Sequence, residues 1–212
     1  MSAPIASTLV LSPDNPCNAA VIDEQGKQLY TVYTEHGKTT VTHVKNADDE
    51  VIASLEWRDV LPDKVTVGNK GPMSLRDWLH TTLVPFYFKD DVTFQDDAGR
   101  KYKWRGNAPG RALEVGQTVA FTLFSEDDGF KEPIARFLKS VRGRGDGTDR
   151  PATLLLTARA VQIRDTVVTS FLFLEKGRRT NETTSQNSAD VLATPVLSAV
   201  TGSDYNVRNG GI

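Results

Sequence analysis

The sequence predicts a single mainly β domain followed by a polar tail. Over the first two-thirds of the chain, short segments rich in Val, Thr, Tyr and Phe alternate with turn residues. A length of 212 residues is ordinary for one β-sandwich or barrel. Towards the C-terminus the chain becomes rich in Asn, Thr, Ser and Gly, which is typical of disorder. We therefore expect a flexible N-terminus over 1–7, one folded domain over 8–179 and a disordered polar tail over 180–212.

Two hairpins are the clearest local predictions. The first pairs 19–22 with a strand starting at Gln28, across turn residues 23–26. The second pairs 92–94 with 101–104 across an Asp-Asp-Ala-Gly turn. In its second strand, alternation puts Tyr102 and Trp104 on one face and Lys101, Lys103 and Arg105 on the other. Further strands are expected over 38–44, 51–57, 118–124 and 152–158.

Two segments raise the question of helix. Residues 74–81 favour a short helix, because Ser74 can cap it and its apolar residues follow helical spacing. Residues 163–175 include an uncharged run that is apolar on nearly every side. Its β-branched residues favour a strand, whereas its length and the basic residues after it suit a helix. Periodicity alone leaves both readings open.

Composition restricts the function classes. The net charge of −2 provides no general attraction to nucleic acid, so we expect none as a partner. A single cysteine, Cys17, excludes an internal disulfide and cysteine-pair zinc sites. The chain shows neither a secretory signal nor an apolar run long enough to span a membrane. We therefore expect an intracellular protein, cytoplasmic or nuclear, without a transmembrane segment.

No motif predicts catalysis, a cofactor or a metal site. The histidines His36, His43 and His80 each stand alone, without metal-ligand spacing. Nucleophile elbows, P-loops and dinucleotide fingerprints are missing. Acidic clusters occur near residues 90–97 and 126–128, but the alternation of a calcium loop does not. We expect no catalytic residues, no metal and no cofactor.

The order of several motifs resembles a known family. These motifs are Asn15-Pro16, Leu29-Tyr30, Ala53 with Trp57, the Gly99–Trp104 stretch (Gly-Arg-Lys-Tyr-Lys-Trp), and the run 165–175 followed by Arg178-Arg179. Over about 8–179 they resemble an uncharacterised domain family found mostly in mushroom-forming fungi. That family is similar to the tubby C-terminal-like superfamily, which includes phospholipid scramblases and LURP-one-related plant proteins.

The resemblance implies a tubby-like closed antiparallel β-barrel of about twelve strands, threaded by a hydrophobic helix. A helix inside a barrel contacts apolar wall on all sides, which suits the character of 163–175. Burial of five or six large side chains, at roughly 1.5–3 kcal/mol each, outweighs their poor helix propensity. We therefore expect a helix there.

A basic cluster is the main candidate binding site. Its members surround a glycine-rich loop, and we call them the loop basic group: Arg136, Lys139, Arg142, Arg144 and Arg150. Tubby-type domains bind phosphoinositide headgroups through basic surface residues, so the resemblance implies an anionic lipid or other anion here. The alternative is an ordinary solvated loop of mixed charge. The row on the hairpin face, Lys101, Lys103 and Arg105, has the alternative role of protecting an exposed strand.

Three function classes follow. The first is a non-enzymatic intracellular binding module, with anionic membrane lipids as its candidate ligand. The second is an enzyme whose site assembles from dispersed residues, which a deep polar pocket containing a histidine would favour. The third is a protein-partner scaffold whose tail orders on contact.

Overall fold

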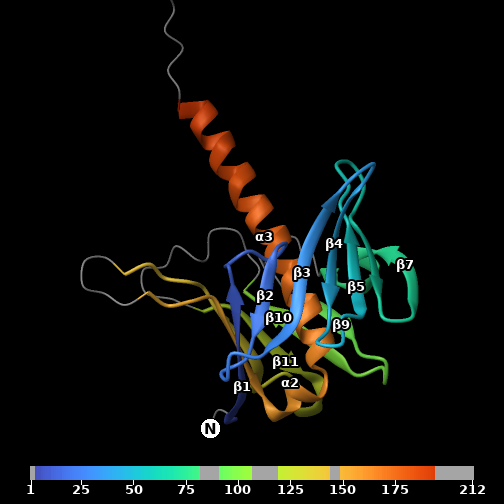
Figure 1. The fold of residues 1–212 in the computed structure, drawn as a ribbon, viewed down its shortest axis with the longest axis vertical. Coiled ribbons are helices and arrows are strands. Elements are labelled where there is room, and N and C mark those ends of the chain that lie inside the picture. Colours follow the sequence, from blue (N-terminus) through green and yellow to red (C-terminus); the bar gives the residue numbers. More distant parts are fainter. Residues whose placement is uncertain (1–2, 82–90, 107–118, 144–148, 194–212) are drawn as a thin grey trace, which may run out of the picture.

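The computed structural model describes residues 3–81, 91–106, 119–143 and 149–193, with side chains up to Thr184 at the C-terminal end. Thirteen strands form one antiparallel sheet in the order β7-β6-β5-β4-β3-β2-β1-β13-β12-β11-β10-β9-β8 (Figure 1). The first seven strands are β1 (Ile5–Ser12), β2 (Ala19–Ile22), β3 (Gln28–His36), β4 (Thr40–Lys45), β5 (Val51–Glu56), β6 (Lys64–Val67) and β7 (Lys70–Ser74). The others are β8 (His80–Thr81), β9 (Val92–Gln95), β10 (Lys101–Arg105), β11 (Val119–Ser125), β12 (Pro133–Leu138) and β13 (Thr153–Thr157).

The sheet consists of two meanders, β1–β7 and β8–β13, joined by pairing of the first strand with the last. Each strand pairs with the next along the chain, except that β7 does not pair with β8, and β1 pairs with β13. The expected closed barrel is therefore wrong for the described residues: strands β7 and β8 are edges of an open sheet. Strand β8 has two residues and β7 contains Pro72, both features that oppose edge pairing.

The short helix α1 (Leu75–Trp78) lies between the two edge strands in the sequence. As predicted, Ser74 caps it, accepting a hydrogen bond from the Arg76 amide. Trp78 is buried and packs edge-on against Phe173, with ring centroids 6.3 Å apart. Lys70 Nζ of β7 lies 2.9 Å from Asp97 Oδ1 in the β9–β10 turn. The ion pair thus links edge strand β7 to the β9–β10 turn, and the aromatic contact anchors α1 on the central helix.

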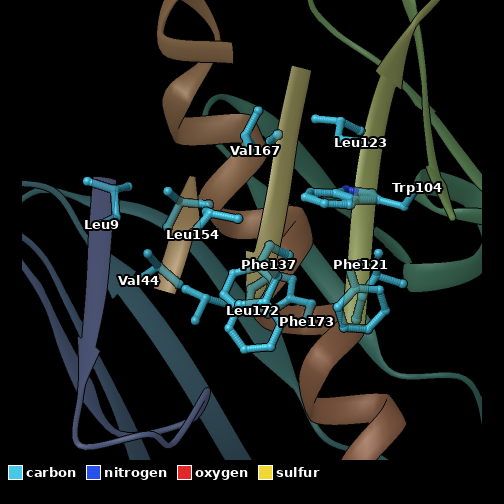
Figure 2. Close-up of a cluster of buried hydrophobic side chains, with 14 of the residues drawn as sticks. Leu9, Val44, Trp104, Phe121, Leu123, Phe137, Leu154, Val167, Leu172 and Phe173 are labelled. Atoms are coloured by element: carbon cyan, nitrogen blue, oxygen red, sulfur yellow. The ribbon is translucent and has the colours of Figure 1, made fainter. Parts of the chain in front are cut away.

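Helix α3 (Arg164–Ala193) follows the five-residue helix α2 (Ala158–Gln162) and confirms the helix expected over 163–175. Every residue from Val167 to Glu175 is buried, so this part of α3 meets side chains on all sides. Phe171 lies 4.4 Å, centroid to centroid, from Phe137 of β12. Figure 2 shows the resulting core, in which aromatic and aliphatic side chains from the sheet surround the helix.

The strands confirm most sequence expectations. Both hairpins form with the predicted turns, and Tyr102 and Trp104 point into the core. Strands β1, β6, β7, β8 and β12 were not predicted. The helix expected over 74–81 ends at Trp78, and His80–Thr81 form β8 instead. Strand β1 begins at Ile5, inside the segment expected to be flexible, and α3 continues to Ala193, inside the expected disordered tail. The remainder of the tail, 194–212, lies outside the described residues.

Candidate functional site

Arg136 lies on the outer face of the sheet, in the middle of β12. Its neighbours Ala135 and Phe137 are buried in the core, and Arg136 is half-buried on the opposite side. In the strand register, Arg136 faces Thr122 of β11, and Thr122 faces Arg105 of β10. Residues that face each other on adjacent strands share one face of a sheet. Arg136 and Arg105 therefore belong to one cross-strand row.

The outer basic row continues this surface along β10; its members are Lys101, Lys103 and Arg105. Two of them share Asp91, with Lys103 Nζ 3.4 Å and Arg105 Nε 3.8 Å from its carboxylate oxygens. Lys101 Nζ lies 3.8 Å from Glu126 Oε1. The Lys101–Glu126 pair is exposed, and exposed ion pairs contribute about 0–1 kcal/mol, so Lys101 can exchange this partner for an external anion at little cost. Lys103 and Asp91 are partly buried.

Lys139 does not share this outer surface. Its Nζ lies 3.9 Å from Glu182 Oε1 on α3. Burial, assisted by the charge of Arg178, lowers the pKa of Lys139 below its ordinary value. Lys139 therefore contributes to the contact between the end of β12 and α3. It is no longer a candidate ligand-binding residue.

Arg142 and Arg150 lie where the β12–β13 hairpin extends beyond its strands. The backbones of Val141 and Arg150 exchange two hydrogen bonds of 2.9 Å, which holds the base of this extension. The side chains of Arg142 and Arg150 are exposed. Arg144 lies outside the described residues. Among the described members of the loop basic group, the structure thus separates an outward arginine on β12, an inward lysine and two exposed arginines of the hairpin.

Sequence reasoning missed an ionic cluster where α3 leaves the sheet. Glu175 is fully buried and accepts hydrogen bonds from Arg178 Nε at 2.7 Å and from Arg179 Nε at 2.7 Å. Arg178 also pairs with Glu182, and Arg179 Nη1 donates to the Asp14 carbonyl at 2.8 Å while its other amino group pairs with the Asp14 carboxylate. Buried charges persist only when paired in this way. The helical spacing of Glu175 with the two arginines was the signal available in the sequence.

A polar cleft of about 520 Å³ lies at the opposite end, between the β9–β10 turn and the start of α3. Its charged side chains are engaged with one another. Tyr30 Oη donates to Asp165 Oδ1 at 2.5 Å, and Arg164 Nε donates to Tyr30 Oη at 3.0 Å. Arg100 Nε donates to Asp96 Oδ2 at 2.9 Å. The charged side chains of the cleft wall are thus oriented by bonds to one another and to Tyr30.

Asp96 organises the wall of this cleft. Its carboxylate accepts hydrogen bonds from the Ala98 and Arg100 amides and from Tyr102 Oη, at 2.9–3.0 Å. Burial and the bond to Asp96 raise the pKa of Tyr102 to about 12. Arg159 Nη2 in turn donates to Tyr102 Oη at 2.6 Å. This phenol stays protonated at neutral pH and serves structure, not proton abstraction.

The candidate catalytic groups are not assembled in the described part of the chain. His43 stacks on Tyr33 with centroids 5.1 Å apart, and His36 and His80 are exposed. The cleft described above contains no histidine. Burial raises the pKa of the Cys17 thiol, which opposes thiolate chemistry.

The acidic clusters have local structural roles where they are described. Asp128 accepts from the amides of Lys131 and Glu132, at 3.1 and 2.7 Å, and Asp127 Oδ2 accepts from Arg159 Nε at 2.8 Å. Within residues 3–81, 91–106, 119–143 and 149–193, no three acidic, histidine or cysteine side chains are grouped to hold a metal ion. These carboxylates serve turns and ion pairs.

Together, these features define a mainly β domain whose open sheet surrounds a central helix and whose exposed cations gather on the outer face and hairpin. The model of a family of unknown function, DUF6593, matches residues 14–180, and the chain belongs to this family. Among solved structures, the chain is similar to an X-ray structure of an Arabidopsis thaliana protein, with 10% identity and a TM-score of 0.38, covering 80% of this chain and 91% of that chain. No curated protein matches the sequence. Among the helices described, none is long and apolar enough to cross a membrane.

Proposed function

We propose that this protein is a non-enzymatic binding module that docks on the anionic headgroups of phospholipid membranes through basic residues of its outer face and β12–β13 hairpin. The observation that carries the proposal is the row Arg105–Thr122–Arg136. It unites two basic segments that are separate in the sequence. Exposed Arg142 and Arg150 extend the positive charge beyond the end of β12.

The filled interior supports a surface function. Side chains of α3 from Val167 to Glu175 occupy the space that a substrate would need inside the sheet. The polar cleft at the start of α3 has the size of a ligand-binding cavity, but such cavities are mostly apolar, whereas paired charges line this cleft. This arrangement argues against an enzyme whose active site lies inside the sheet.

The resemblance to the tubby C-terminal-like superfamily supports the choice of ligand. Its members bind phosphoinositide headgroups through basic surface residues, and membrane-bound cations contribute about 1 kcal/mol each near an anionic surface.

Co-sedimentation with neutral and phosphoinositide-containing liposomes, at low and physiological salt, tests the proposal. We expect binding to anionic liposomes alone, weakened by salt. Charge reversal of Arg142 and Arg144 together should weaken it at least about tenfold, because each cation contributes about 1 kcal/mol. Lys27→Glu, an exposed residue of the β2–β3 turn, is the matched control and should bind like the native protein. Equal binding to neutral liposomes, or indifference to charge reversal, would refute the proposal.

One observation favours a second function, that of a protein-partner scaffold. Helix α3 continues past the sheet to Ala193 (Figure 1). A projecting helix is an available surface for a partner, consistent with a tether that orders on contact. In that case, removal of the segment after Thr184 should abolish capture of the partner while liposome binding stays at its native level, whatever that level is.

A further inference from the structure

Two aromatic side chains lie on the outer face beneath the basic row. The Nζ atom of Lys103 lies 4.8 Å from the ring centroid of Phe130, and the guanidinium carbon of Arg105 lies 4.4 Å from that of Phe124. Phe124 and Phe130 are both half-buried, and Phe124 faces Lys103 in the register of β10 and β11. The outer face therefore carries apolar rings in contact with cationic side chains.

Phe130 is held there by an unfavourable backbone conformation. Its φ is +60°, in the left-handed region, directly after Gly129 at +71°. Aspartate tolerates the left-handed region, as Asp49 does with a φ of +63°. A bulky phenylalanine is strained there. A glycine or asparagine would follow the same turn with less strain. Since the ring is only half-buried, core packing does not account for a phenylalanine at this position.

The cations above the rings form only long ion pairs. Lys103 and Arg105 share one carboxylate, Asp91, at 3.4 and 3.8 Å, beyond the length of a strong charge-assisted hydrogen bond. Long basic side chains can swing towards phosphate while their stems stay on apolar surface. When they do, the rings of Phe124 and Phe130 become accessible.

From this geometry we infer that Phe124 and Phe130 form an aromatic contact that enters the headgroup region of an anionic bilayer while Lys103 and Arg105 bind lipid phosphates. Aromatic side chains favour this zone, where apolar and polar surroundings meet. The inference rests on the proposed function and adds to it a contribution that does not depend on charge. It predicts that the protein binds the membrane surface more tightly than it binds a free phosphorylated headgroup.

A single-stranded nucleic acid is the competing ligand, because bases also stack on aromatic rings beside cations. The local charge favours the bilayer. Nucleic-acid binding depends on several phosphate contacts, whereas Asp91 and Glu126 lie within the basic row and the chain is acidic overall. A bilayer can gain from two rings even where the local positive charge is modest.

Phe130→Asn and Phe124→Thr test the inference in vesicles of phosphatidylcholine with and without phosphatidylserine. Each variant should bind anionic vesicles about tenfold more weakly, as expected for loss of one buried aromatic contact, with an unchanged salt dependence. Phe130→Asn should keep or raise the melting temperature, because it relieves the left-handed strain. Arg105→Gln should instead reduce the salt dependence. Val51→Thr, at an exposed apolar position on β5, is the matched control and should bind as the native protein does.

The outcomes are distinguishable. If the native protein ignores anionic vesicles, the proposed function fails and this inference fails with it. If the native protein binds and both phenylalanine variants bind equally well, only the inference is overturned. If the variants lose affinity for oligothymidylate while vesicle binding is unchanged, the rings serve nucleic acid and the inference is wrong. Phe130→Gly provides a second variant of the same turn should Phe130→Asn fail to fold.

Discussion

The indole N–H of Trp104, on β10, donates a 3.0 Å hydrogen bond to Oγ of Ser170, on α3. Both residues are fully buried. Ser170 Oγ donates in turn to the carbonyl of Val167, one turn earlier, at 3.1 Å. The only polar atom of the Trp104 side chain is therefore satisfied by the central helix, which fixes how α3 is rotated against the sheet.

Ser170→Ala should destabilise the protein. The substitution leaves the buried Trp104 N–H without an acceptor, and such a loss costs about 1–3 kcal/mol. Urea titration followed by tryptophan fluorescence measures the change in the free energy of unfolding. Thr183→Ala, at an exposed position of the same helix, is the control and should have little effect. Equal stability of Ser170→Ala and the native protein would show that this bond does not fix the helix.

Phe171→Asp should abolish folding. Phe171 is buried between the rings of Phe137 and Phe121, at centroid distances of 4.4 and 6.3 Å. An unpaired charge there costs several kcal/mol, against a typical domain stability of about 5–15 kcal/mol. Near-ultraviolet circular dichroism reports the loss of packing. Phe171→Leu keeps an apolar side chain, so this control should remain folded. A folded Phe171→Asp would mean that α3 is not the centre of the core.

Asp96 should make stability depend on pH in the acid range. Burial opposes its ionisation, but hydrogen bonds from Arg100 and Tyr102 outweigh burial and hold the pKa of Asp96 below its ordinary value. Because this pKa is depressed, ionised Asp96 contributes fully to the free energy of unfolding above the unfolded-state pKa, about 3.9. That contribution is lost as the pH falls through the folded-state pKa. Thermal melting between about pH 2 and 5 should show this loss in the native protein, and a smaller one in Asp96→Asn, which cannot ionise. Identical acid profiles would contradict the assignment.

Two truncations should locate the C-terminal boundary of the folded domain. Deletion after Arg179 removes Glu182, which pairs with buried Arg178 and with Lys139, so the melting temperature should fall. Deletion after Thr184 keeps that pair and should leave the melting temperature at its native value. Differential scanning calorimetry compares both with the full chain. Equal melting temperatures for all three would place the boundary at Arg179, as the composition alone predicts.

Local sequence signals accounted for the hairpins. In both predicted turns an aspartate, Asp23 or Asp96, accepts from amides two and four residues later, and a glycine three residues on takes a positive φ of about +80°. These interactions lie within five residues, so a sequence reveals them directly. Strand β12 was harder to predict, because it begins at Pro133 and carries Arg136 in its middle.

The candidate site could be predicted only in part. Without β12 as a strand, there was no alternation to place Arg136 outward, nor any indication that Lys139 would turn towards Glu182. The cation–aromatic contacts depend on strand register and on the left-handed turn at Phe130, neither of which composition reveals. The central helix was ambiguous for a related reason, since a segment buried on all sides shows no periodicity.

The order of the strands has a consequence for how the protein folds. Strands β1–β7 and β8–β13 are two meanders in which each strand needs only its neighbour in the chain, so both can form early and independently. Their union depends on the β1–β13 ladder, whose partners lie at opposite ends of the domain, and on α3, which joins last during synthesis. Closure of that long loop should limit the folding rate. A chain divided between β7 and β8 should therefore yield two fragments that reassemble when mixed. The β1–β13 ladder would form the interface between them.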